Sequence, residues 1–273
     1  MISIITPSYN QGIFIEETIK SVLGQGYPNL QYIIIDGGSM DGTLEIIRKY
    51  EGHLAYWVSE PDKGQYHAIN KGFERADGEI IGWLCSDDTY LPGALDYVGK
   101  IFDEQAQINV LLGGWNYIDE AGKLLWTEYA RYHQRELALG AGRIGQPATF
   151  WRRRVYERLG PISEEFQHCM DGEYFLRMGQ FFEFYPVKKV LANYRLHQNS
   201  KTVAEHRKMQ EAWEVIARRY GAEFSLNPWK RLFQLRYQVA KNRHRLAKLK
   251  SMIQCGTLIK YLARKYRKFD NSF

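Results

Sequence analysis

Cysteine is scarce in this chain, and the few cysteines do not cluster. The 273 residues contain three, Cys85, Cys169 and Cys255, which lie far apart and are odd in number. They fit neither a disulfide framework nor a metal-ligand spacing, so we expect a reducing compartment. The sequence shows no basic-then-apolar leader, and no apolar run approaches the roughly 20 residues that cross a bilayer. We therefore expect no signal peptide and no transmembrane helix, which favours a cytoplasmic protein.

Two common nucleotide-binding motifs are also missing. No G-x-G-x-x-G follows the first apolar run, which argues against a dinucleotide-binding dehydrogenase. No G-x-x-x-x-G-K-[ST] occurs anywhere in the sequence, which excludes a P-loop protein. The overall composition, with 45% hydrophobic and 25% charged residues, is ordinary for a soluble globular chain.

Positive charge is concentrated in the C-terminal segment. Residues 227–273 contain 13 Lys and Arg and one acidic residue, whereas residues 1–226 contain 24 basic and 30 acidic residues. Apolar and basic residues interleave there at a spacing compatible with an amphipathic helix. Such a segment indicates either docking on an anionic membrane surface or a helical arm packed on the body or on a partner subunit. Nucleic acid is not expected as a partner, because the sequence contains no recognisable nucleic-acid-binding motif.

Strand-like and helix-like patterns alternate four times in the first ninety residues. Apolar runs at 2–6, 32–36, 55–58 and 79–88 alternate with segments whose apolar residues have helical spacing. This alternation predicts an α/β fold with a mostly parallel central sheet flanked by helices. Further strands are expected near 110–112, 146–151 and 187–196.

The run from Glu79 to Asp88 ends in two adjacent carboxylates, Asp87 and Asp88. In an open α/β sheet, ligands bind at the carboxyl ends of the strands. Adjacent carboxylates repel each other unless a cation, solvent or hydrogen-bond donors are close by, and hard divalent cations are the usual partner. The alternative is that one of the two aspartates caps the following helix.

An aromatic-rich stretch runs from Trp115 to Tyr132 and includes Tyr117, Trp126 and Tyr129. These side chains either belong to the core and its cover or form a wall on which an acceptor sugar stacks. The sequence pattern alone leaves both interpretations open.

Four motifs in order resemble glycosyltransferase family 2. They are ITPSYN at 5–10, DGGSMDGT at 36–43, SEPDKGQYHAINKG at 59–72 and SDD at 86–88. The resemblance spans roughly residues 1–200. It implies a GT-A fold and an inverting enzyme that transfers a sugar from a nucleoside diphosphate donor. Together with the charge distribution, it leads us to expect a glycosyltransferase domain at 1–226, with a nucleotide-sugar-binding half at 1–114 and an acceptor half at 115–226, followed by a basic amphipathic helical extension at 227–273.

The resemblance assigns donor-binding roles to matching positions. Asp36 corresponds to the carboxylate that accepts a hydrogen bond from a nucleobase ring N–H, and Asp87 to the residue facing the ribose. An Asx-type turn is the alternative role for Asp36. The remaining implied donor-binding residues are Pro7, Ser8, Tyr9 and Asn10 around base and ribose, and Lys63 and Gly64 near the phosphates.

The resemblance also implies a metal site and a catalytic base. Asp88 corresponds to the metal-binding carboxylate, with His197 as a second candidate ligand, and the ion would be Mn²⁺ or Mg²⁺. Asp171 corresponds to the base, although Met170 replaces the glutamate that usually precedes it, and Glu173 is the reserve candidate. The alternative for Asp171 is a helix N-cap, and a lone histidine such as His197 is often structural.

The expected activity is sugar transfer, with a UDP-sugar favoured because Asp36 suits a pyrimidine N3–H. The acceptor would be a lipid-linked or growing surface polysaccharide, with the enzyme peripheral on the inner face of the cytoplasmic membrane and a homo-oligomer left open. The competing hypotheses are a nucleotidyltransferase, which also pairs carboxylates with a metal, and a non-catalytic sugar-nucleotide-binding protein at the membrane.

Overall fold

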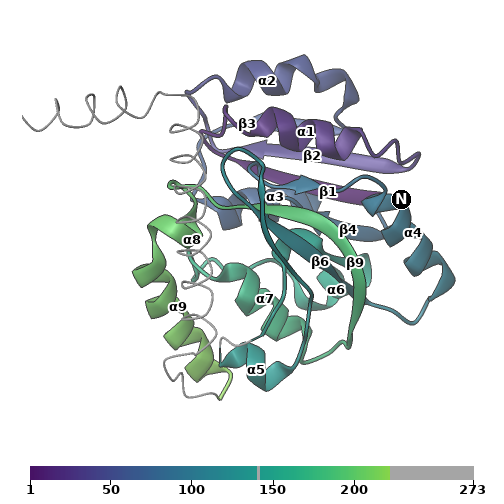
Figure 1. Cartoon of the computed structure of the whole chain (residues 1–273), viewed down its shortest axis with the longest axis vertical. Coiled ribbons are helices and arrows are strands. Elements are labelled where there is room, and N and C mark those ends of the chain that lie inside the picture. Colours follow the sequence, from purple (N-terminus) through teal and green to yellow (C-terminus); the bar gives the residue numbers. More distant parts are fainter. Residues whose placement is uncertain (140–141, 222–273) are drawn as a thin grey trace, which may run out of the picture. The chain divides into compact units, whose positions relative to one another are not determined.

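The computed structural model describes residues 1–139 and 142–221 (Figure 1). The predicted boundary at 226/227 and the basic extension at 227–273 lie outside these residues. Within the described residues, the expected alternation of strands and helices is confirmed.

The first half of the chain forms the parallel part of the sheet. Strands β1, β2, β3 and β4 lie in the order β3-β2-β1-β4, and all three pairings are parallel. Strand β1 therefore lies where the order of the strands reverses, and in sheets of this kind the loops that leave such a point bind ligands. The bounds are β1 (Ile2–Ser8), α1 (Ile15–Leu23), β2 (Leu30–Asp36), α2 (Thr43–Lys49), η1 (Glu51–His53), β3 (Tyr56–Ser59), α3 (Gln65–Arg75) and β4 (Ile80–Trp83).

The second half continues the same sheet with mixed pairing. Strand β8 pairs antiparallel with both β4 and β6, β9 runs parallel to β6, and β5 lies at the edge beside β9. The bounds are β5 (Thr89–Tyr90), α4 (Ala94–Glu104), β6 (Val110–Ile118), β7 (Leu124–Glu128), α5 (Gln134–Ala138), η2 (Gln146–Ala148), β8 (Thr149–Arg152), α6 (Arg153–Leu159), α7 (Met170–Met178), β9 (Phe184–Arg195), α8 (Lys201–Ala204) and α9 (His206–Arg219).

Several sequence-based boundaries differ from the structure. The run expected as a strand at 79–88 forms β4 only from Ile80 to Trp83, and the residues up to Asp88 leave the sheet in a turn. The strand expected at 146–151 begins as the 3₁₀ turn η2, because Pro147 has no N–H for a ladder hydrogen bond, and β8 starts only at Thr149. The strand expected at 110–112 extends to Ile118 and carries the first part of the aromatic stretch.

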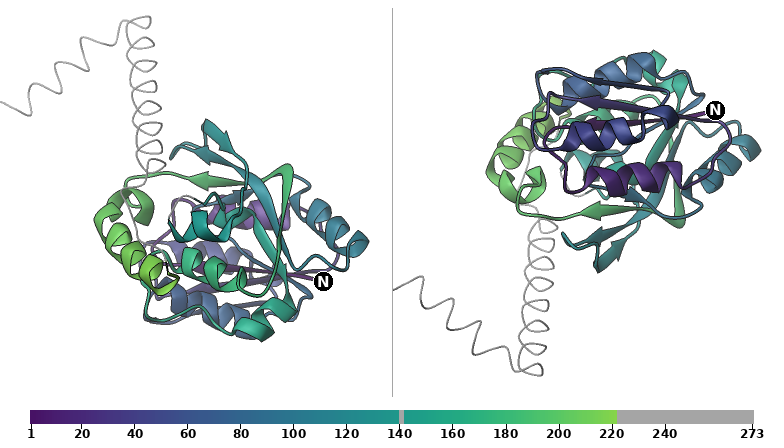
Figure 2. Two further views of the ribbon diagram at one scale, coloured as in Figure 1. Left: turned by 90° about the horizontal axis from the view of Figure 1, so that it is seen from below. Right: turned by 90° about the horizontal axis from the view of Figure 1, so that it is seen from above.

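Side chains that alternate along the strands fill two separate layers, because successive residues of a strand point to opposite faces. One face of the parallel strands packs against α3 and α7, and the other against α1, α2 and α4 (Figures 1 and 2). The first layer includes Ile5, Ile33, Ile35, Ile81 and Trp83, and the second includes Ile2, Ile4, Tyr32, Ile34 and Ile80.

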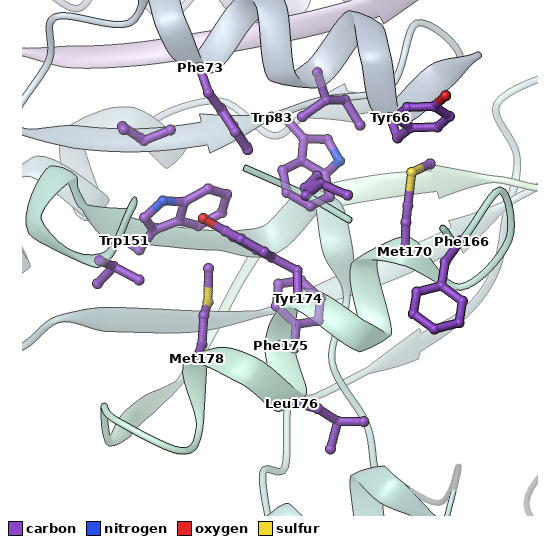
Figure 3. Close-up of a cluster of buried hydrophobic side chains, with 14 of the residues drawn as sticks. Tyr66, Phe73, Trp83, Trp151, Phe166, Met170, Tyr174, Phe175, Leu176 and Met178 are labelled. Carbon is purple, nitrogen blue, oxygen red and sulfur yellow. The ribbon is translucent and has the colours of Figure 1, made fainter. Parts of the chain in front are cut away.

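Aromatic side chains anchor helix α7 on the sheet (Figure 3). The ring of Phe175 stacks on that of Trp83 with centroids 6.3 Å apart, and Tyr174 packs edge-on against Trp151 at 6.0 Å. All four rings are at most 2% exposed. Because truncating one buried aromatic to alanine typically costs about 3–5 kcal/mol, this layer holds α7 firmly in place. The start of α7, where Asp171 lies, therefore has a well-defined position.

Candidate active site

Three polar residues line up at the carboxyl ends of β1, β2 and β3. Ser8 is paired in register with Asp36, and Asp36 with Ser59. The Asp36 carboxylate is fully buried. Its Oδ2 accepts hydrogen bonds from the backbone N–H groups of Gly38 at 3.0 Å and Ser39 at 2.8 Å and from Ser59 Oγ at 2.7 Å. This is the Asx-type turn weighed as the alternative for Asp36. Its other oxygen, Oδ1, accepts from Ser39 Oγ at 2.5 Å and retains capacity for a second donor.

The loops that follow β1 and β2 are tied together through Asn10. The Asn10 backbone N–H donates to Ser39 Oγ at 2.7 Å, and the Met40 N–H donates to Asn10 Oδ1 at 3.0 Å. Asn10 has a left-handed φ of 50°, a conformation that asparagine tolerates better than most residues. It does not cap the following helix, since α1 begins at Ile15 after Phe14. These bonds hold the predicted base-binding loop in one conformation.

Two further residues of this loop have features typical of a ligand site. The Tyr9 side chain is 59% exposed at the edge of the sheet. Ser8 Oγ, at the end of β1 and adjacent to Asp36, is buried and has no hydrogen-bond partner among the described residues. A buried hydroxyl without a partner is costly unless a ligand or water completes it.

The predicted phosphate-binding residues lie at the start of α3. Gly64 has a φ of +118°, which side chains rarely adopt, and its N–H donates to Asp62 Oδ1 at 2.7 Å. Lys63 is exposed, and its backbone carbonyl accepts from Gln167 Nε2 at 3.3 Å. The N-terminus of a helix favours negative charge because its N–H groups are unpaired and its dipole is positive there.

Asp87 and Asp88 lie together in the turn between β4 and β5. Ligand atoms of Cys85, Asp87 and Asp88 are all within 4.8 Å of one another. Burial and the charge of Asp87 raise the pKa of the Asp88 carboxyl well above its usual value. The helix-cap alternative is wrong, because α4 begins at Ala94 with Gly93 at its N-cap.

The end of β9 holds this acidic pair in place. The Arg195 backbone N–H donates to Asp88 Oδ1 at 2.8 Å, and Arg195 Nε donates to the Asp87 carbonyl at 2.8 Å. The Arg195 side chain is 1% exposed and also binds Glu17 at 2.6 Å. His197 Nε2 lies 3.0 Å from Asp87 Oδ2. The structure therefore places His197 against Asp87, whereas the group of ligand atoms around Asp88 consists of Cys85, Asp87 and Asp88. The roles of Asp88 and His197 as metal ligands stay predictions.

The chemistry of these donors fits a hard divalent cation. Carboxylate oxygens with an imidazole nitrogen nearby suit Mn²⁺ or Mg²⁺. Burial raises the pKa of the Cys85 thiol well above its usual value, so the thiol stays protonated and is a poor ligand for such an ion. A cation would also relieve the repulsion between the buried Asp88 carboxylate and the partly exposed Asp87.

Asp171 lies in the first turn of α7. The N-cap of this helix is Cys169, so the N-cap alternative for Asp171 is wrong. Burial raises the pKa of the Asp171 carboxyl, while hydrogen bonds from the backbone N–H groups of Gly172 and Asp171 and the charge of Lys201 oppose the shift. Carboxyl groups that act as general bases often have a raised pKa.

Glu173 is engaged elsewhere. Its carboxylate is buried and binds Arg177 at 3.2 Å, and it accepts a hydrogen bond from the Tyr220 hydroxyl at 2.9 Å. These contacts link α7 to the end of α9. The reserve role of Glu173 as a base stays a prediction.

Three residues near the carboxylates were not singled out from the sequence. Burial raises the pKa of both Tyr117 and Tyr194, and the charge of Asp88 adds to the shift in each case. Lys201 Nζ donates to the Gln167 carbonyl at 3.4 Å and interacts with the charge of Asp171. Tyr117 belongs to the aromatic stretch, but nothing in the pattern distinguished it from its neighbour Trp115, which is only 3% exposed and belongs to the core.

Comparison with known protein families matches residues 3–160 to the family described as Glycosyl transferase family 2. The chain belongs to glycosyl transferase family 2. One relative of this glycosyltransferase is the putative teichuronic acid biosynthesis glycosyltransferase TuaG of Bacillus subtilis, 41% identical over 101 residues, which cover 35% of this chain and 39% of TuaG.

Solved structures share the fold of this glycosyltransferase. S. aureus TarS 1–349 in complex with UDP-GlcNAc aligns with a TM-score of 0.63 and 20% identity, over 79% of this chain and 65% of that chain. The mannosyltransferase PcManGT of Pyrobaculum calidifontis, in complex with GDP-Man and Mn²⁺, aligns with a TM-score of 0.61 and 19% identity, over 80% and 64%. The expected GT-A fold is thereby confirmed. Among the described residues, no helix is long and apolar enough to span a bilayer.

Proposed function

We propose that this glycosyltransferase transfers a sugar, with inversion, from a nucleoside diphosphate donor to an acceptor hydroxyl. The observation that carries the proposal is that two kinds of acidic group lie around Cys85: besides burial, the charges of Asp88, Asp87 and Asp171 all raise the pKa of its thiol. Asp87 and Asp88 are adjacent and would hold a cation, and Asp171 is a separate carboxyl in α7 whose pKa burial raises. Inversion by single displacement needs a cation to stabilise the leaving diphosphate and a base to take the acceptor proton. It needs no nucleophile from the enzyme.

The donor nucleotide would bind at the ends of β1 and β2. Ser8 Oγ and Asp36 Oδ1 each have hydrogen-bonding capacity left at this edge, and Tyr9 offers an exposed aromatic ring. A uracil fits these groups, because its N3–H can donate to a carboxylate and its carbonyl oxygens can accept from a hydroxyl. The diphosphate would extend towards Lys63 and Gly64 at the start of α3, with Asp87 beside the ribose.

Asp88, with His197 and Asp87 beside it, would hold the divalent cation. When bound, Mn²⁺ or Mg²⁺ neutralises charge on the diphosphate and so makes it a better leaving group. Arg195 and Thr18 keep this part of the chain in position. Thr18 Oγ1 donates to the backbone carbonyl of Asp88 at 2.7 Å, and the Arg195 N–H donates to its carboxylate.

Asp171 would take the proton of the acceptor hydroxyl. The acceptor oxygen forms a bond to the anomeric carbon from the face opposite the diphosphate, the bond from that carbon to the phosphate oxygen breaks, and the hydroxyl proton passes to Asp171. The ammonium of Lys201 favours the ionised form of this base. Glu173 is less suited to the role because Arg177 and Tyr220 already occupy its carboxylate.

A surface polysaccharide or a lipid-linked glycan would supply the acceptor hydroxyl. The similarity to TuaG supports a polysaccharide. The 13 basic residues in 227–273 would dock the enzyme on the anionic inner face of the cytoplasmic membrane, since each basic residue near such a surface contributes about 1 kcal/mol. Assembly as a homo-oligomer would also be compatible with this arrangement.

Product analysis with a panel of nucleotide sugars tests the proposal. Release of nucleoside diphosphate that requires Mn²⁺ or Mg²⁺ and stops in Asp171→Asn is the expected result. Release of pyrophosphate would instead identify a nucleotidyltransferase. Donor binding without transfer, in every donor and acceptor combination, would identify a non-catalytic binding protein.

A further inference from the structure

The short segment that leads into the proposed base is bound to the last two described helices. His168 Nε2 contacts the Glu205 carboxylate, which lies between α8 and α9. Cys169 Sγ donates to the backbone carbonyl of Met209 in α9 at 3.4 Å. Helix α9 runs beside α7 in Figure 1. Contacts with Glu205 and α9 therefore hold the residues immediately before Asp171 in place.

Helix α9 also approaches the α7 backbone at Gly172, where Trp213 lies against the glycine. A Cβ placed on Gly172 would lie 2.1 Å from Cζ3 and 2.5 Å from Cη2 of the Trp213 indole. The indole is 7% exposed and belongs to the same core layer as Met170 and Tyr174. Gly172 is therefore the position where α9 approaches the α7 backbone too closely for any side chain.

This glycine carries an intrinsic cost. Glycine in a helix is about 1 kcal/mol less favourable than alanine. Gly172 has a helical conformation and is not among the positions with positive φ, so its backbone does not require glycine. The approach of the Trp213 ring is the physical reason that a larger residue does not fit here.

The backbone on the other side of Asp171 is also constrained. Cys169 has a φ of +57°, which costs a residue other than glycine about 1–3 kcal/mol and persists only where surrounding contacts fix it. The contacts of Cys169 with Met209 and of His168 with Glu205 supply that support from α9 and from the residue before it. Asp171 therefore lies between two backbone positions that both depend on this helix.

We propose that Trp213 is a positioning residue for the base: its indole, seated on Gly172, sets the place of the Asp171 carboxylate. The inference rests on the proposed function of Asp171. The inference gives α9 a role in catalysis. In the described contacts, α9 acts on Asp171 only through the backbone of α7. Because a displacement of about 1 Å in a reacting group can lower a rate about 100-fold, a small shift of α7 would be measurable.

Gly172→Ala in the full-length chain is the direct test. The added methyl would push α7 away from Trp213, so we expect kcat to fall at least about 10-fold, with the donor KM within about twofold of wild type. The acid limb of the pH–rate profile should also move, because the surroundings of Asp171 change. Adding Trp213→Leu to Gly172→Ala makes room for the methyl group. On a logarithmic scale, the double variant should recover at least half of the decrease in kcat.

Val98→Ala in α4 is the matched control, since it removes volume from the opposite core layer. It should lower the melting temperature and leave kcat per folded molecule unchanged. A Gly172→Ala enzyme that loses stability but keeps wild-type kcat and pH profile would overturn the inference, as would a double variant that recovers no activity.

Asp171→Asn separates this inference from the proposed function. If that variant keeps wild-type turnover, the base assignment fails, and the proposed function fails with it. If Asp171→Asn is inactive while Gly172→Ala is fully active, only the positioning role of Trp213 is lost.

Discussion

The backbone N–H of Arg195 donates to Asp88 Oδ1 across a distance of 2.8 Å, although 107 residues separate the two in sequence. Through this bond the last strand of the sheet fixes the orientation of the proposed metal-binding carboxylate. The side chain of Arg195 adds a bond to the Asp87 carbonyl at 2.8 Å. The acidic pair therefore depends on β9 as much as on β4.

Arg195→Met should weaken binding of Mn²⁺. The substitution removes the bonds to the Asp87 carbonyl and to Glu17, which hold the chain around the acidic pair. Loss of a group that orients metal ligands typically lowers metal affinity about 10–100-fold, and calorimetric titration with Mn²⁺ would measure it. Arg154→Met, at an exposed arginine elsewhere, should leave the affinity unchanged. Equal affinities in the two variants would contradict the role of Arg195.

Asp88→Asn should stabilise the metal-free protein at neutral pH. Burial and Asp87 raise the pKa of Asp88, so the folded state binds its proton more tightly than the unfolded state does. This stabilising contribution is present at acid pH and is lost as the pH rises through the raised pKa. Removing the charge should raise the melting temperature by about 2–4 °C for each kcal/mol gained.

The same variant should lose the stabilisation that Mn²⁺ gives the wild type. At about 100 times its Kd, a ligand adds about 2.7 kcal/mol of stability to the folded state. Thermal unfolding with and without Mn²⁺ measures both effects in one experiment. A full Mn²⁺ response in Asp88→Asn would exclude Asp88 as a ligand.

The pH dependence of transfer should report on Asp171 and Lys201. A base acts in its ionised form, and burial raises the pKa of Asp171 above the ordinary 3.8, so kcat/KM should fall as the pH drops through that raised value. The charge of Lys201 lowers the pKa of Asp171. Lys201→Met should therefore move the acid limb to higher pH, whereas Lys100→Met, at an exposed lysine of α4, should not. A limb that stays in place or moves to lower pH would disprove the coupling.

Ser39→Ala should weaken donor binding more than it slows transfer. Ser39 Oγ donates to Asp36 and accepts from the Asn10 N–H, so it joins the two loops of the proposed nucleotide site. Losing two buried hydrogen bonds should raise the donor KM about 10-fold, with kcat within about threefold of wild type. Initial-rate kinetics against the donor measure this, with Ser163→Ala as a surface control. An unchanged KM would show that these loops do not hold the base.

The parallel half of the fold and several of the site residues were predictable from sequence because their signals are local. The strands that end in Ser8 and Asp36 show as short apolar runs that end in polar residues, and a parallel sheet brings such ends to one edge. The Asp87–Asp88 pair is visible as a motif in the same way. In each case the chemistry lies within a few residues of the strand that positions it.

The remaining features depend on contacts between distant parts of the chain. The sequence around Arg195 gives no sign that it holds Asp87 and Asp88, and a glycine in a helix does not identify Trp213 as its neighbour. The capping alternatives, for Asp87 or Asp88 and for Asp171, agree with the local sequence. They failed because Gly93 and Cys169 occupy the N-caps, which depends on where each helix begins in three dimensions.

Strand β8 has a consequence for how substrates enter and leave. Strand β8 of the second half is hydrogen-bonded to β4 and to residues 110–112 of β6, which lie on the donor side of the predicted division at 114/115. This continuous ladder resists the opening of the two halves as separate bodies. In the proposed function, exchange of nucleotide and acceptor would therefore come from movement of the loops at the sheet edge.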